Sequence, residues 1–225
     1  TEPDVSPLAV QGPRSDDLMA KIVGDHIRDL GFFRFKKFNF NSQELIIARS
    51  GYSKQGGFEI YVDDFSKGEE IWDTLFEAGR DLDVRAGCPN LIERIESGLL
   101  SFGSDMTNDN TPHESGLSKF CDTRNAIKCV GRDALLKEIE NGPWRQIRFL
   151  SLSGPAVPPC RSMWEARKDN VVIGRVSSAA WSPDFQTNVA IGMIHREHWD
   201  PGTSLIIETP DGPREAQIMA KPFVQ

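Results

Sequence analysis

The sequence predicts an α+β protein, a mixed α/β domain followed by a small C-terminal β-barrel. Helical and strand patterns alternate over the first half of the chain. From Arg145 onward, short strands are separated by turn signals, which is typical of a barrel. Between the halves, residues 103–119 are rich in Gly, Ser, Asn, Asp and Thr and predict a long loop. We expect a first domain over 1–110, a crossover loop and helix over 111–144, and the barrel over 145–225.

The first half begins with a strand over residues 8–11 that leads into a helix. Ser15 is placed to cap this helix, its first turn is acidic, and Gly31 ends it. The apolar stripe of the helix comprises Leu18, Ile22, Ile27 and Leu30. Residues 32–40 then alternate as a strand.

Residues 45–62 are predicted to form a β-hairpin with one functional face. Its strands are 45–52 and 58–62, and a loop with two glycines joins them. In the second strand, Glu59 and Tyr61 point away from the apolar side chains of Phe58, Ile60 and Val62. A buried, unpaired carboxylate is costly, whereas a carboxylate beside a phenol suits a flat ligand that presents N–H donors. The alternative is an exposed strand face without a ligand.

The rest of the chain supplies three helices and six strands. Residues 68–78 have helical spacing, and Pro89 opens a helix that runs through Phe102. A short helix over 129–140 is stopped by a Gly-Pro pair. The barrel strands are predicted over residues 147–152, 162–167, 171–180, 189–195, 204–208 and 215–220.

Composition limits the class of protein. With 225 residues, of which 39% are hydrophobic, the chain is long enough to bury a core. A net charge of −7 disfavours nucleic acid as a partner, because phosphate binding needs an excess of basic residues. No apolar run approaches the roughly 20 residues that span a bilayer, and the first residues carry no signal pattern. We therefore expect a cytoplasmic protein without a membrane partner.

The cysteines and histidines give no metal-binding pattern. No C-x-x-C spacing occurs among the cysteines, so reduced thiols are expected at Cys88, Cys121, Cys129 and Cys160. His195 and His198 lie in a predicted turn, and no second cluster supplies the three or four ligands that zinc needs. We expect no metal.

One motif identifies a family. The segment Arg49-Ser-Gly-Tyr-Ser-Lys-Gln-Gly-Gly-Phe-Glu59 resembles the R-x-G-Y-[ST]-x-x-x-G-x-E hairpin of the folate-dependent aminomethyltransferases, the glycine cleavage T-protein family. Further segments fit in the same order, among them Leu8-Ala-Val-Gln-Gly-Pro13, Arg94-Ile-Glu-Ser-Gly-Leu-Leu-Ser-Phe-Gly-Ser-Asp105 and Thr111-Pro-His-Glu-Ser-Gly-Leu117. Together the matching segments cover nearly the whole chain.

The resemblance implies a tetrahydrofolate-binding site in the first domain. Glu59 would hold the pterin ring, Tyr61 would contact both the folate and the methyl donor, and Tyr52 would shape the pocket wall. Phe33 would face the substrate, with a core role as the alternative. Arg49 is expected to pair with a carboxylate and hold the hairpin. No catalytic acid or base is assigned.

Within the family, the segment Arg85-Ala-Gly-Cys-Pro-Asn-Leu-Ile-Glu93 resembles a branch that demethylates the sulfonium dimethylsulfoniopropionate. Asn90 stands where the aminomethyltransferases carry an arginine. The branch implies methyl transfer to tetrahydrofolate, giving methylmercaptopropionate and 5-methyltetrahydrofolate. Alternatives are an aminomethyltransferase or a methylamine demethylase, and a non-catalytic folate-binding protein.

The resemblance also concerns the partners of this chain. The segment at residues 8–13 matches well inside the family's sequence, so we expect an upstream part of the same enzyme to form the other wall of the folate site. The small-molecule sulfonium would be the substrate. A homodimer stays open.

Overall fold

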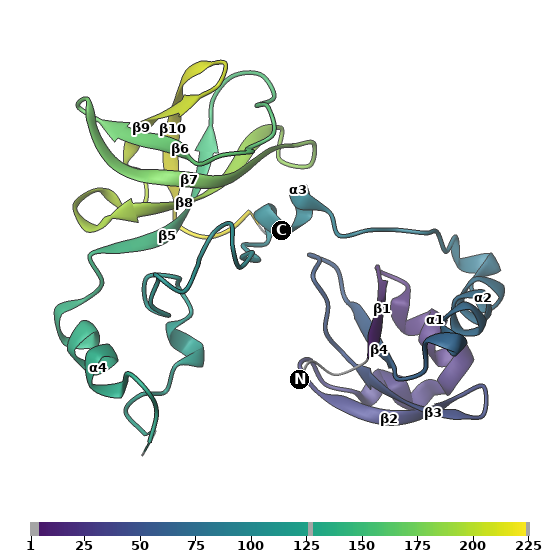
Figure 1. Ribbon diagram of the computed structural model, residues 1–225. Coiled ribbons are helices and arrows are strands. Elements are labelled where there is room, and N and C mark those ends of the chain that lie inside the picture. Colours follow the sequence, from purple (N-terminus) through teal and green to yellow (C-terminus); the bar gives the residue numbers. More distant parts are fainter. Residues whose placement is uncertain (1–4, 126–127, 224–225) are drawn as a thin grey trace. The chain divides into compact units, whose positions relative to one another are not determined.

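The computed structural model describes residues 5–125 and 128–223. The chain divides into two compact units, Thr1–Asn90 and Leu91–Gln225 (Figure 1). The units therefore divide after Asn90, whereas the sequence places the first boundary after residue 110. The difference arises because helix α3 (Leu91–Glu96) packs on the barrel strands of the second unit.

The first unit is built on a four-stranded antiparallel sheet with the strand order β1-β4-β3-β2. Its strands are β1 (Ser6–Gln11), β2 (Phe35–Phe40), β3 (Gln43–Ala48) and β4 (Gly57–Val62). The predicted hairpin is confirmed as β3 and β4. Two strands were predicted too long: the strand over 32–40 begins only at Phe35 as β2, and the first hairpin strand ends at Ala48 rather than at residue 52.

Two α-helices cover one face of this sheet, namely α1 (Ser15–Val23) and α2 (Gly68–Ala78). The bounds of α2 are those predicted. The prediction of one helix up to Gly31 was wrong, because Gly24 adopts φ 93° and a 3-10 helix, Asp25–Asp29, follows. Ser15 does not cap α1 either: it is the first helical residue, and its hydroxyl donates to the carbonyl of Gly56 at 3.3 Å.

The core of the first unit lies between the helices and the sheet. The inner sheet face contributes Phe58, Ile60 and Val62 from β4, all of them buried. Ile71 and Leu75 reach the same core from α2. Full burial of one such side chain stabilises the fold by about 1.5–3 kcal/mol. The opposite face of the sheet is consequently left to Glu59 and Tyr61, as the alternation predicts.

The second unit contains a closed antiparallel barrel with the strand order β10-β5-β8-β7-β6-β9. The strands are β5 (Arg145–Leu152), β6 (Trp164–Lys168), β7 (Val171–Ser182), β8 (Thr187–His195), β9 (Ser204–Thr209) and β10 (Gly212–Met219). All six predicted strands are found, with small shifts at their ends. The turn between β6 and β7 is Asp169 and Asn170, whose φ values of 49° and 63° suit a tight hairpin.

In the described part of the second unit, two α-helices precede the barrel. The helix predicted from Pro89 through Phe102 is shorter and comprises α3 alone. It ends early because Gly98 adopts φ 70° and the amide of Leu99 bonds back to the carbonyl of Arg94 at 2.8 Å. Helix α4 (Arg132–Asn141) ends at Gly142, near the predicted stop. Among the described residues, no helix is long and apolar enough to cross a membrane.

Candidate functional site

The outer face of the sheet in the first unit holds the predicted site. The strand register places Ala9, Glu59, Ala48 and Phe35 in one row across β1, β4, β3 and β2. The next row holds Pro7, Tyr61, Ile46 and Lys37. Both rows point away from the core. Across these two rows the face combines the carboxylate of Glu59 with aromatic and apolar side chains and with the ammonium group of Lys37.

Glu59 is partly buried although both of its direct neighbours in the row are alanines. The hydroxyl of Ser50 donates to its Oε2 atom. Ser50 lies in the loop over residues 49–56, which joins β3 to β4. A hydroxyl donor fixes the direction of the carboxylate, and the alanines leave room for a flat molecule above the row.

The other predicted ligand-binding residues have different surroundings. Tyr61 is partly buried and projects from the same face of β4 as Glu59. Tyr52 lies in the loop and is 40% exposed. Phe33 is 68% exposed, and its ring centroid lies 4.4 Å from that of Phe32. Because it is so exposed, Phe33 does not belong to the hydrophobic core of the first unit. The binding roles of these residues stay predictions.

Arg49 braces the hairpin, as predicted. Its guanidinium donates two hydrogen bonds to Asp16 at the start of α1, at 2.5 and 3.2 Å. It also lies over the ring of Phe58, with 4.5 Å from Cζ to the ring centroid. The ion pair ties the end of β3 to helix α1. Because its charge is already paired, Arg49 is a structural residue of the face.

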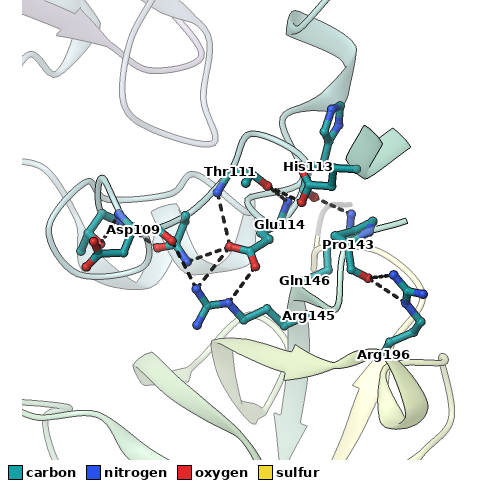
Figure 2. Close-up of polar contacts among 11 residues, drawn as sticks. Asp109, Thr111, His113, Glu114, Pro143, Arg145, Gln146 and Arg196 are labelled. Atoms are coloured by element: carbon teal, nitrogen blue, oxygen red, sulfur yellow. Dashed lines mark hydrogen bonds and ion pairs between the residues drawn. The ribbon is translucent and has the colours of Figure 1, made fainter. Parts of the chain in front are cut away.

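Glu114, for which the sequence predicts no role, fixes the crossover loop of the second unit (Figure 2). Arg145, the first residue of β5, donates to both oxygens of Glu114, at 2.9 and 3.3 Å. The backbone amide of Thr111 also donates to this carboxylate at 3.3 Å. The amide of Ile147 bonds to the Glu114 carbonyl at 2.8 Å. This network fastens the loop to the barrel.

A second buried network in this unit holds α3. Arg94 donates to Asp105 at 2.7 Å and to Ser178 on β7 at 2.5 Å. Ser182, also on β7, donates to Glu96 at 2.5 Å. Arg94 and Glu96 thus bind separate partners, as their spacing on the helix predicts.

In the described part of the chain, no group of three or more His, Cys, Asp or Glu side chains is placed to hold a metal.

Two models of known protein families match this chain. Residues 1–125 match the model of the GCVT N-terminal domain, and residues 145–225 match that of the glycine cleavage T-protein C-terminal barrel domain. In structure, the chain is similar to the glycine cleavage system aminomethyltransferase T from Bartonella henselae. The TM-score is 0.79 at 25% identity, over 98% of this chain and 60% of that one.

Two curated relatives differ in activity. Dimethylsulfoniopropionate demethylase DmdA from Ruegeria pomeroyi is 56% identical over 96% of this chain and 59% of its own length. An aminomethyltransferase from Caldanaerobacter subterraneus subsp. tengcongensis is 31% identical over 97% of this chain and 58% of its own length. The chain thus spans about three-fifths of the curated relatives it matches.

Proposed function

The chain belongs to the glycine cleavage T-protein family, and from this premise we propose that it is part of a tetrahydrofolate-dependent demethylase. The enzyme transfers a methyl group from dimethylsulfoniopropionate to tetrahydrofolate. Its products are methylmercaptopropionate and 5-methyltetrahydrofolate. The observation that carries the proposal is the oriented Glu59 carboxylate on an open sheet face, flanked by Ala9 and Ala48 and followed by Tyr61.

This face fits the pterin ring of tetrahydrofolate. A carboxylate can accept two parallel hydrogen bonds from the ring's amino group and the adjacent ring N–H. Glu59 supplies the two oxygens, and its alanine neighbours leave space for the plane of the ring. Tyr61 and Tyr52 supply aromatic surface for the rest of the ligand. Glu59 is therefore assigned to pterin binding.

The methyl donor is assigned from chemistry and from the relatives. A sulfonium is a cation that accepts no hydrogen bond, so an aromatic face is a suitable partner, worth about 1–2 kcal/mol when desolvated. Tyr61 and the exposed Phe33 are the aromatic side chains proposed for this contact. Support comes from the 56% identity to the demethylase, against 31% to the aminomethyltransferase.

The reaction asks little acid–base chemistry of the protein. Tetrahydrofolate would supply N5 as the nucleophile for the methyl group, the thioether would leave with the electron pair of the broken C–S bond, and the N5 proton would pass to water. Because the leaving group is a neutral thioether, a protonating residue is not required. Glu59, Tyr61 and Phe33 would align the reactants and exclude water, and alignment accounts for much of the rate in such displacements.

The activity is proposed for the full-length protein that carries this sequence. The relatives are longer than this chain, which covers 59% of the demethylase. We expect the additional part to supply another wall of the folate site, so that residues 1–225 alone bind folate weakly and do not turn over.

An aminomethyltransferase is the second candidate, which the 31% identity to that enzyme favours. The two are separated by incubating full-length protein and tetrahydrofolate with either the sulfonium or an aminomethyl donor. Formation of 5-methyltetrahydrofolate with methylmercaptopropionate supports the demethylase. Methylene-tetrahydrofolate from the amine donor, with no reaction of the sulfonium, would move the protein to the aminomethyltransferases. Folate binding without either product would indicate a non-catalytic protein.

A further inference from the structure

Gln11, the last residue of β1, bonds to both sides of the loop over residues 49–56. Its Nε2 atom donates to the carbonyl of Ser50 at 3.0 Å and to the carbonyl of Phe58 at 3.2 Å. Its Oε1 atom accepts a hydrogen bond from the hydroxyl of Ser53 at 2.9 Å. One partly buried amide thus connects the start of the loop, its middle and the strand that follows.

Two glycines make room for this amide. A Cβ atom built on Gly51 would lie 2.1 Å from Oε1 of Gln11, and one on Gly57 would lie 2.6 Å from Nε2. Both distances are far below any van der Waals contact. The Gln11 amide therefore fills the space that side chains at these positions would occupy. The glycines of the loop and Gln11 form one packing unit.

The unit ends at the carboxylate of the proposed pterin site. Ser50, whose carbonyl Gln11 holds, donates its hydroxyl to Oε2 of Glu59. Phe58, whose carbonyl Gln11 also holds, directly precedes Glu59. Gln11 therefore fixes the backbone on both sides of the Ser50–Glu59 hydrogen bond. We infer that Gln11 is a positioning residue for pterin binding, acting through Ser50 on the Glu59 carboxylate; this inference rests on the proposed function.

A positioning role is physically reasonable because a bidentate hydrogen bond depends on the direction of the carboxylate plane. A glutamate on an open face loses rotamer freedom when it binds a ligand, and this entropy opposes binding. The Ser50 hydroxyl removes part of that freedom before the ligand arrives. Its own position depends on the loop backbone, which Gln11 holds. Loss of the Gln11 amide should therefore weaken folate binding more than it lowers stability.

The test compares Gln11→Met with the parent in full-length protein. Methionine has a similar length and still covers the glycines, but it lacks the amide donors. We expect the KM for tetrahydrofolate to rise roughly tenfold, with kcat changed less than about twofold, as the loss of well-placed hydrogen bonds predicts. Hydrogen exchange of the amides of loop 49–56 should accelerate, while that of α2 should not. Gln217→Met makes the same substitution in the barrel, where it removes one exposed hydrogen bond from the Gln217 amide to the Gly202 carbonyl at 3.3 Å, and it is the control.

The Ser50 hydroxyl is tested by a second pair of variants. Ser50→Ala should raise the KM as Gln11→Met does, and Ser50→Thr, which keeps the hydroxyl, should restore a value near the parent's. Folate binding and loop exchange that are unchanged in Gln11→Met would overturn the inference, as would a loss of kcat and melting temperature with unchanged KM. A parent that does not bind tetrahydrofolate would overturn the proposed function itself, and the inference with it.

Discussion

Ala48 on β3 lies directly opposite Glu59 on β4, on the outer face of the sheet. Residues paired in this way have Cβ atoms about 4.5–5.5 Å apart, so the side chain at position 48 decides how open the carboxylate is. Ala9 holds the equivalent position on β1. The small side chains on both sides of Glu59 are the feature that makes this face suitable for a flat ligand.

Replacement of Ala48 by leucine should cover the carboxylate. We expect Ala48→Leu to weaken tetrahydrofolate binding by at least about tenfold, because the added side chain occupies the space of the ring, while the melting temperature changes little. Asn39→Leu adds a similar side chain to the same sheet face, two rows away, and is the control. Calorimetric titration of both full-length variants measures the effect. Equal weakening by both would show that position 48 has no special access to the ligand.

Two adjacent glycines should differ in their tolerance of alanine. A Cβ on Gly57 would lie 2.3 Å from the carbonyl oxygen of Val10, whereas one on Gly56 meets no atom within 4 Å. We expect Gly57→Ala to lower the free energy of unfolding by about 1–3 kcal/mol through strain between β1 and β4. Gly56→Ala should unfold like the parent. Denaturant unfolding of the two variants checks this, and an unaffected Gly57→Ala would contradict the register of β1 and β4.

The buried ion pair between Arg94 and Asp105 should be sensitive to the loss of one partner. Both side chains are at least nine-tenths buried. Arg94→Met leaves the Asp105 charge without its cation, which costs about 3–5 kcal/mol of stability. Lys37→Met breaks the exposed pair with Glu44 and should leave the unfolding midpoint close to the parent's. A small effect of Arg94→Met would contradict the role of this pair in holding α3 on the barrel.

The thiols should differ in reactivity. Burial, with a smaller contribution from Asp105, raises the pKa of Cys160 to about 11, whereas Cys88 and Cys129 are exposed. Since only the thiolate reacts, at pH 8 roughly one Cys160 thiol in a thousand is reactive. Iodoacetamide at pH 8 should therefore label Cys88 and Cys129 first, and Cys160 labelling should accelerate as the pH rises toward 10. Mass spectrometry of the digested protein measures the order. Early labelling of Cys160 would show that partial burial does not raise the pKa of its thiol in this way.

The sequence predicted which side chains of β4 share the outer face of the sheet, because that signal is local. Alternation along β4 alone assigns Glu59 and Tyr61 to the side opposite Phe58, and the structure confirms this separation.

The ends of the helices were less predictable. The apolar stripe continues to Ile27, but α1 ends before Gly24. A 3-10 helix follows and keeps the Ile27 side chain in the core, so the stripe does not reveal the break.

Contacts between distant residues could not be predicted from local patterns. Gln11 and Ser50 meet only because β1 pairs with β4, and the register of that pairing is not written in either segment. Glu114 and Arg145 were likewise separate polar residues until the loop was placed against the barrel. Opposite charges allow such a pair, but they allow many other pairings in this sequence equally well.

Calorimetric titration of tetrahydrofolate into full-length parent and Glu59→Gln measures directly whether Glu59 anchors the pterin. The amide keeps the size of the side chain but replaces one acceptor oxygen by a donor, which opposes the ring's N–H groups. We predict that the binding free energy weakens by about 1–3 kcal/mol, with a nearly unchanged melting temperature. Equal affinity of parent and variant would show that Glu59 does not anchor the pterin.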